Sequence, residues 1–248
     1  TRRRAHREAA RVSVTFVARD AVWSMDATHL GRDVIGRAVQ AEAVREVAST
    51  RTIGIAVGPQ ATDEEVGTLL EQVAVQRGGF PRVLLTDNGG AYVSDAVEAW
   101  CRRHRVLHLL SLPRTPQHNG ASEHGMRELK EDAALGKGNL VLDMREAPAL
   151  LEASRDRIDG HRLRRTRAWR TAVQADRGMP HWSALVSRED LWERATCEIS
   201  RALLHCQGER ARRRATRAAI YAALAHFSVI TRTRGGRPWT ASSAERVS

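Results

Sequence analysis

The segment PRVLLTDNGGAYVSD, residues 81–95, decides the fold because a short strand within it ends on a carboxylate. Residues 83–86 (VLLT) favour a buried β-strand, and Asp87 follows them directly, with an Asn-Gly-Gly turn behind it. Asp and Asn-Gly are ordinary residues at a strand end, because they tolerate turn conformations and bond their own backbone. Strand ends are also where α/β sheets present functional groups. The rest of the sequence has to separate these two interpretations.

Outward from this segment, the sequence predicts three leading strands and then alternating helices and strands. Residues 21–30 and 51–58 are typical of strands, whereas 33–50 fits either one long strand bent at Gly36 or a short helix. A capping box at Thr62 and Glu65 opens a helix that ends at Gly78. The strand at 83–86 and another at 106–112 follow, with helices expected at 94–105 and about 121–135. This order predicts an α/β fold with a mixed five-stranded sheet, flanking helices and a mostly helical, basic C-terminal region.

The charge of the chain is unevenly distributed along the sequence. The formal net charge is +11, and it divides into +4 over residues 1–20, −3 over 21–150 and +10 over 151–248. Basic segments on both sides of an acidic centre favour a polyanionic partner such as nucleic acid. A preference for arginine on ordinary solvated surfaces would give the same composition.

The composition also argues against several classes of protein. The three cysteines are widely spaced without a CxxC pair, which is typical of reduced thiols rather than a disulfide framework or a zinc site. No apolar run approaches the roughly 18 residues of a membrane span, and no secretory signal follows the basic start. We therefore expect a protein without a membrane partner.

Three acidic residues stand out by position: Asp26 within WSMDATH, Asp87 at the strand end, and Glu123 in the first turn of a predicted helix. A buried, unpaired carboxylate is costly, so Asp26 needs a proton, a cation or an arginine unless it faces solvent. Adjacent parallel strands would place Asp26 beside Asp87, and the helix could bring Glu123 over the same edge. Three converging carboxylates suit Mg²⁺ or Mn²⁺, and two such ions can drive an in-line phosphoryl displacement.

The segments around these three residues resemble the catalytic core of the DDE integrase and transposase superfamily, found in bacterial insertion sequences and retroviruses. The resemblance rests on VWSMDATH, TDNGGAY and PRTPQHNGASEHGMRELKE, in this order and with 35 residues between Asp87 and Glu123. STRTIGIAV is similar to the strand that follows the first motif in that family. The resemblance covers about residues 20–137 and implies an RNase H-like fold. It implies that Asp26, Asp87 and Glu123 are the catalytic residues and bind Mg²⁺, as two ions, with Mn²⁺ as a substitute.

The resemblance also implies DNA contacts beside the triad. Gln117, Asn119 and Gly120 match the family's Q-x-N-G turn, and Lys130 matches a basic position that contacts the DNA end. Arg127 joins this set by helical spacing, although a solvated stripe would look the same. The sequence departs from the family at His124, where arginine is common after the glutamate. The histidines near the site, His104, His108, His118 and His124, fit surface positions better than catalytic ones.

Three regions follow from this reading. Residues 1–20 are expected to form a basic linker or the end of a truncated upstream DNA-binding domain, and 21–137 the integrase catalytic core. Residues 138–248 are expected to form a basic, mainly helical region, in which 188–240 suits a winged-helix-like unit or, equally, a plain helical tail with a terminal hairpin.

The sequence thus predicts a DNA transposase or integrase, a two-metal polynucleotidyl transferase that cleaves and joins mobile-element DNA ends. We expect it to act on double-stranded DNA as a homo-oligomer, in the bacterial cytoplasm at the nucleoid. One alternative is a catalytically silent DNA-binding transposon remnant or regulator. The other is an RNase H-like nuclease that hydrolyses without joining.

Overall fold

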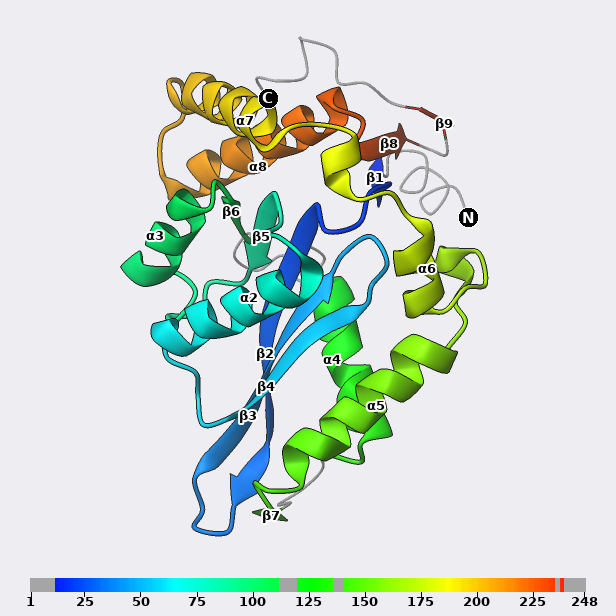
Figure 1. Cartoon of the computed structure of the whole chain (residues 1–248). Coiled ribbons are helices and arrows are strands. Elements are labelled where there is room, and N and C mark those ends of the chain that lie inside the picture. The colour runs from blue at the N-terminus through cyan, green and yellow to red at the C-terminus, as the bar shows by residue number, and fades with distance from the viewer. Residues whose placement is uncertain (1–11, 112–119, 136–140, 235–236, 239–248) are drawn as a thin grey trace, which may run out of the picture.

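The computed structural model describes residues 12–111, 120–135, 141–234 and 237–238 of the chain. Its main sheet has the strand order β4-β3-β2-β5-β6, and the short β7 pairs with the far end of β2 (Figure 1). β3 is antiparallel to both of its neighbours, β2 and β4, whereas β5 and β6 run parallel to β2. The bounds are β2 Val22–Asp33, β3 Ala38–Glu46, β4 Thr52–Gly58, β5 Val83–Thr86, β6 Leu107–Leu110 and β7 Val141–Leu142. The predicted mixed sheet is confirmed.

The ambiguous segment 33–50 contains the end of β2, a turn and β3, so the alternative prediction of a short helix is wrong. β2 extends to Asp33, and the chain turns through Gly36, whose φ of 83° lies in the left-handed region, before β3 begins. β3 is paired on both sides, with β2 and with β4. The alanines and glutamates of this segment dilute its β-propensity, but pairing with two neighbours overrides that local preference.

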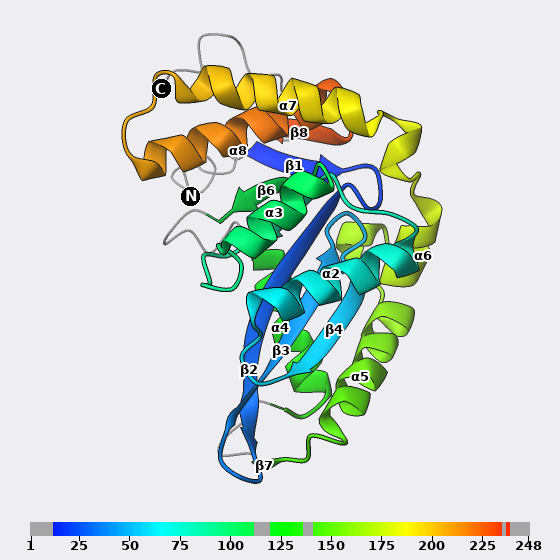
Figure 2. The same cartoon turned by 60° about the vertical axis from the view of Figure 1, so that its left-hand side comes forward.

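Helices cover both faces of the sheet, and neighbouring strand residues show which helices lie on which face. α2 (Asp63–Arg77) and α3 (Asp95–Arg103) pack on one face with Trp23, Val44 and Leu84. α4 (Gly120–Asp132) and α5 (Ala147–His161) pack on the other, where Ala43 lies next to Val44 in sequence but on the opposite side. Figures 1 and 2 show α2 and α3 on one side of the sheet and α4 on the other.

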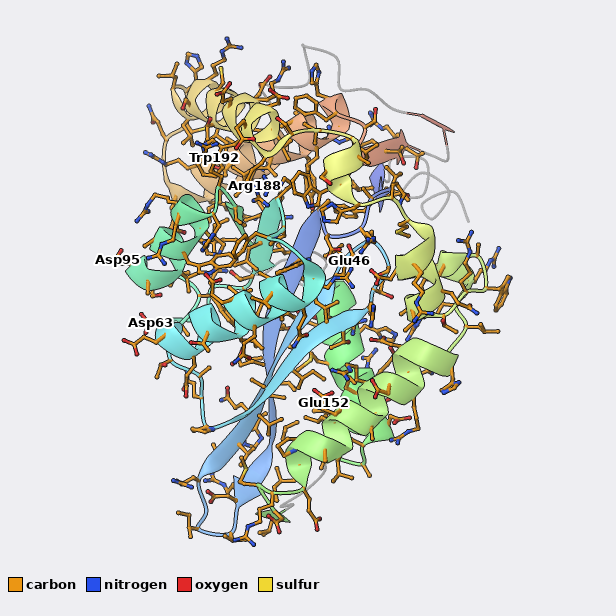
Figure 3. All side chains as sticks on the ribbon, viewed as in Figure 1. Glu46, Asp63, Asp95, Glu152, Arg188 and Trp192 are labelled. Carbon is orange, nitrogen blue, oxygen red and sulfur yellow. The ribbon has the colours of Figure 1, made fainter. Side chains whose placement is uncertain are left out.

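The C-terminal helices α7 (Arg188–Leu203) and α8 (Glu209–His226) form a helical hairpin over the upper end of the sheet (Figure 2). They share an apolar cluster with the strands, formed by Val22, Val83, Leu85, Leu107, Leu109, Leu191, Ile220 and Leu224 among others. At the start of α7, Arg188, labelled in Figure 3, donates hydrogen bonds to the carbonyls of Phe80, Pro81 and His104. The helical hairpin is therefore fixed to the same sheet that carries Asp87.

A second, small sheet joins the two ends of the described chain. β1 (Val12–Phe16) pairs antiparallel with β8 (Ile230–Arg234), which also pairs with the short β9 (Arg237–Pro238). The expected hairpin is thus present as β8 and β9, although its turn at 235–236 lies outside the described residues. The connection between α5 and α7 contains α6 (Ala172–Gly178) and two short 3-10 helices, η2 (Arg165–Arg167) and η3 (Trp182–Ala184). The predicted domain boundaries and the winged-helix-like unit stay predictions.

Within the described ranges, none of the helices combines the length and apolar composition that a membrane span requires.

Candidate active site

The register of two parallel strands brings Asp26 and Asp87 to the same edge of the sheet. β2 and β5 pair through Val22–Val83, Trp23–Leu84 and Ser24–Leu85, so continuing the register by two residues sets Asp26 beside Asp87. Asp26 is only 9% exposed, whereas Asp87 is half-buried where β5 gives way to its turn. One Asp87 carboxylate oxygen accepts a 2.8 Å hydrogen bond from the backbone N–H of Gly89. Asp87 therefore has the ordinary role of a turn residue and also projects a carboxylate at the strand end.

Glu123 reaches the same region from the first turn of α4, where its side chain is exposed. The pKa of Asp26 is raised to about 7, mainly by burial and then by the negative charge of Asp87, with smaller contributions from Glu123 and Glu42. The backbone N–H of Ala27 donates to Asp26 at 3.0 Å and opposes this rise. The three acids that the sequence singled out thus lie near enough for their charges to interact, although they are far apart in the chain.

The donor chemistry at this edge fits a hard divalent cation. The charged groups with the largest effect on the pKa of Asp26 are carboxylates, and in the described part of the chain no lysine or arginine forms an ion pair with Asp26, Asp87 or Glu123. Oxygen ligands of this kind are those that Mg²⁺ and Mn²⁺ prefer. Among the described residues, however, no three His, Cys, Asp or Glu side chains are already grouped closely enough to hold a metal ion.

A fourth carboxylate, Glu42, lies beside this group and was missed in the sequence. Its side chain is buried on β3 and accepts a hydrogen bond from the hydroxyl of Tyr92, which lies in the turn after Asp87. Burial raises the pKa of Glu42, the bond from Tyr92 lowers it, and the charge of Asp87 raises it further. Burial and Glu42 also raise the pKa of the Tyr92 hydroxyl, so this group remains a donor at neutral pH.

A chain of polar side chains behind Asp87 supports the end of β5. The side chain of His108 on β6 is 4% exposed and lies 2.6 Å from a carboxylate oxygen of Glu98 and 2.9 Å from the hydroxyl of Thr86. The hydrogen bond from His108 is the main reason that the pKa of Glu98 is lowered. His108 is therefore an internal support for the residue before Asp87, rather than the surface histidine that the sequence favoured.

The structure describes only some of the residues that the sequence predicts to contact DNA. Arg127 is exposed and lies 2.7 Å from Nδ1 of His124, while the Lys130 ammonium lies 3.5 Å from the backbone carbonyl of His29 on β2. Gly120 is the first residue of α4, and Gln117 and Asn119 lie outside the described residues.

Gly125 lets the buried side chain of Arg45 pass against the backbone of α4, two residues after Glu123. A Cβ atom built on Gly125 would lie 1.2 Å from Nη1 of Arg45, so no other residue fits without displacing this guanidinium. Arg45 is 7% exposed and donates a 2.5 Å hydrogen bond to the carbonyl of Thr50. The contact fixes α4, and with it Glu123, against β3.

A family model described as the integrase core domain matches residues 17–116, a span that contains Asp26 and Asp87 and ends before Glu123. The chain contains an integrase core. The resemblance stated from the sequence motifs is therefore confirmed. The match covers β2 to β6 with α2 and α3, which is the part of the sheet that forms the edge described above.

Relatives of the integrase core come from retroviral elements and from a bacterial insertion element. The chain is 34% identical over 111 residues to a Pol-related polyprotein of mouse intracisternal A-particle MIA14, which is 44% of this chain and 12% of that protein. It is 33% identical over 103 residues to an uncharacterized 39.2 kDa protein of insertion element IS476 from Xanthomonas euvesicatoria, which is 41% of this chain and 29% of that protein. The chain thus spans less than a third of either relative.

Solved structures share the fold of the integrase core at low sequence identity. A chain of the simian T-cell lymphotropic virus intasome matches with a TM-score of 0.54 and 20% identity, over 65% of this chain and 56% of that one. The HTLV-2 integrase catalytic core domain, in a trimeric form with magnesium, matches with a TM-score of 0.50 and 15% identity, over 65% and 99%. These likenesses support the fold.

Proposed function

We propose that this protein is a DNA transposase or integrase that cleaves and joins mobile-element DNA ends by metal-dependent phosphoryl transfer. The observation that carries the proposal is the β2–β5 register, which sets Asp26 beside Asp87 at the open edge of an integrase core. The similarity to an insertion-element protein and to retroviral Pol proteins supports the same class of reaction.

In this proposal Asp26, Asp87 and Glu123 are the catalytic carboxylates and hold Mg²⁺, as two ions, with Mn²⁺ as a substitute. When bound, such ions activate the attacking water or 3′-hydroxyl and stabilise the oxygen that leaves. Asp26, whose pKa is raised by burial and by its acidic neighbours, would hold a cation in its ionised form and so would release its proton on binding. Asp87 is oriented by the N–H of Gly89, and exposed Glu123 closes the group from α4.

Positive groups beside the carboxylates would bind the DNA. Arg127 and Lys130 follow Glu123 on α4, and we assign them, with Gln117, Asn119 and Gly120, to contacts with the DNA end. Phosphate contacts of this kind position the substrate and make the affinity strongly dependent on salt. The substrate would be double-stranded DNA, both the element ends and the target.

The wider organisation is part of the same proposal. Two DNA ends have to meet in transposition, so we propose a homo-oligomer on DNA, acting at the nucleoid in the bacterial cytoplasm. Residues 21–137 would be the catalytic core, 1–20 a basic linker or the end of an upstream DNA-binding domain, and 138–248 a basic accessory region. We also propose that residues 188–240 form a winged-helix-like unit.

Strand transfer with purified protein tests the proposal. A labelled duplex made from the DNA flanking the coding region is incubated with a supercoiled plasmid and Mg²⁺ or Mn²⁺. We expect labelled duplex joined to plasmid, no product in EDTA, and loss of joining in Asp87→Asn with duplex binding retained. The carboxamide of Asn keeps the size of the side chain while removing the charge that a metal requires.

The other outcomes identify the alternatives. Nicked DNA without any joined product would indicate a nuclease that only hydrolyses. Binding without cleavage, even in Mn²⁺, would indicate a silent DNA-binding remnant or regulator, and the proposed reaction would be wrong.

A further inference from the structure

The first half of α8 carries a dense group of arginines beside the candidate active site. Residues 209–217 read ERARRRATR, whereas the second half of α8 is apolar and packs on the sheet through Ile220, Ala223 and Leu224. The apolar half therefore anchors the helix, and the arginine-rich half extends from that anchor toward the carboxyl ends of the parallel strands.

Two contacts show which way this half of α8 faces. Arg217, 8% exposed, donates a 3.1 Å hydrogen bond to the carbonyl of Leu110, the last residue of β6. One turn earlier, Arg213 donates to the side-chain oxygen of Asn88, the residue directly after Asp87. Asn88 in turn donates to the carbonyl of Ser111 at 3.0 Å. The arginine face of α8 thus meets the ends of both β5 and β6.

Helical geometry places Arg210 and Arg214 on this same face. Arg210 lies three residues before Arg213 and seven before Arg217, and Arg214 lies three residues before Arg217. Arg212 projects from the other side of the helix. Arg210, Arg212 and Arg214 are exposed, and within the described ranges none of them forms an ion pair. The single acid of this half, Glu209, pairs with Arg213.

We propose that Arg210 and Arg214 bind the phosphate backbone of DNA as it passes the carboxylate edge, and that Arg213 is a positioning residue that holds Asn88. The inference rests on the proposed function and adds a DNA-contacting element from the C-terminal region. A site built of carboxylates repels a polyanion, so positive charge beside it has to supply the attraction. Arginine suits this role because its planar guanidinium can bind phosphate through two parallel hydrogen bonds.

The test is the salt dependence of duplex binding, measured by fluorescence anisotropy in EDTA so that no turnover occurs. Arg210→Gln/Arg214→Gln is compared with Arg145→Gln/Arg177→Gln, which removes two exposed arginines near β7 and on α6 that form no ion pair with another described residue. Figures 1 and 2 show β7 and α6 far from the start of α8. Arg212→Gln is the control on the opposite side of α8, and Arg210→Lys/Arg214→Lys keeps the charge.

We expect the α8 double variant to bind at least tenfold more weakly at moderate salt. The slope of log K against log salt should fall by about 1.8, since each lost phosphate contact contributes about 0.9. Arg210→Lys/Arg214→Lys should recover most of the wild-type slope. Arg212→Gln and the distant pair, Arg145→Gln/Arg177→Gln, should keep the wild-type slope. Equal slopes in the α8 double variant and the distant pair would overturn the inference.

The outcomes of this test can be told apart from a failure of the proposed function. If wild-type protein joins DNA ends but the slopes are equal, only the role of α8 is wrong. If the α8 variant loses binding while wild-type protein shows no joining, the DNA surface stands and the catalytic proposal fails. For Arg213, Arg213→Gln should lower the rate of joining more than it lowers affinity, and an unchanged rate would refute its positioning role.

Discussion

Replacing Asp26 with asparagine should stabilise the metal-free protein at alkaline pH, although it removes a proposed catalytic group. The pKa of Asp26 rises from the ordinary 3.8 to about 7, because the side chain is buried and faces other carboxylates. At 1.36 kcal/mol for each pH unit, ionising Asp26 in the folded protein costs about 4 kcal/mol relative to the unfolded chain. Asparagine carries no charge and can still accept the hydrogen bond from Ala27.

The sign of the pH dependence follows from the raised pKa. The folded protein binds the proton of Asp26 more tightly than the unfolded chain does. The stability that protonated Asp26 contributes is therefore fully present below pH 3.8 and is lost as pH rises through about 7. Urea unfolding in EDTA between pH 5 and 8.5 should therefore show an advantage of Asp26→Asn that grows to about 4 kcal/mol. Adding Mn²⁺ should stabilise wild-type protein and narrow the difference.

Asp176 provides a control of opposite sign. Burial raises its pKa, but hydrogen bonds from Arg77 and Arg51 outweigh this effect and lower it overall. The stability that ionised Asp176 contributes to the fold is present above its pKa in the unfolded chain and is lost as pH falls through its pKa in the folded protein. Asp176→Asn should therefore destabilise the protein at pH 8 by roughly 3–5 kcal/mol. If Asp26→Asn is instead less stable than wild type at pH 8, the repulsion inferred at this edge does not exist.

Three further substitutions test buried contacts, one at the start of β5 and two beside the site. Arg82→Met should be neutral or stabilising by up to about 3 kcal/mol in thermal unfolding, because the guanidinium is 1% exposed and its nitrogens have no hydrogen-bond partner among the described residues. A clear loss would show that the contact of the guanidinium with the Trp182 ring, 4.0 Å away, outweighs the cost of burying it. Gly125→Ala should cost more than about 3 kcal/mol in urea unfolding by displacing Arg45, and a loss near zero would contradict that contact. Tyr92→Phe should lower the free energy of unfolding at pH 8 by about 1–3 kcal/mol, because Glu42 loses its hydrogen-bond donor. Equal stability of the variant and wild-type protein at pH 8 would mean that this hydrogen bond does not stabilise the fold.

Much of the site could be predicted because strand ends and helix starts are local features. Asp87 follows four consecutive buried residues, and its turn chemistry is written in the adjacent Asn-Gly-Gly. The motif around Asp26 marked a strand, and a parallel neighbour that ends just before Asp87 can present that carboxylate beside Asp26, which lies within β2. The same holds for the helix at Thr62, whose capping box is present.

The supporting contacts could not be predicted because they join residues that are distant in sequence. Glu42 and Tyr92 are 50 positions apart, and Glu42 lies in the segment with the weakest β signal, although its AVQAEAV pattern alternates. Arg213 is 125 positions from Asn88, and nothing local indicates that the first half of α8 lies over the end of β5. The strand at 12–16 was likewise not foreseen, because its partner is at 230–234.

The central claim is that Asp26, Asp87 and Glu123 together bind divalent ions, and the electron paramagnetic resonance of Mn²⁺ measures this binding without requiring turnover. Protein bound to a DNA duplex is titrated with Mn²⁺, and the loss of the free-ion signal gives the number of bound ions and their affinity. We expect two bound ions per active site in wild-type protein, and at least tenfold weaker binding in each of Asp26→Asn, Asp87→Asn and Glu123→Gln. Equal Mn²⁺ binding by wild-type protein and all three variants would contradict the claim.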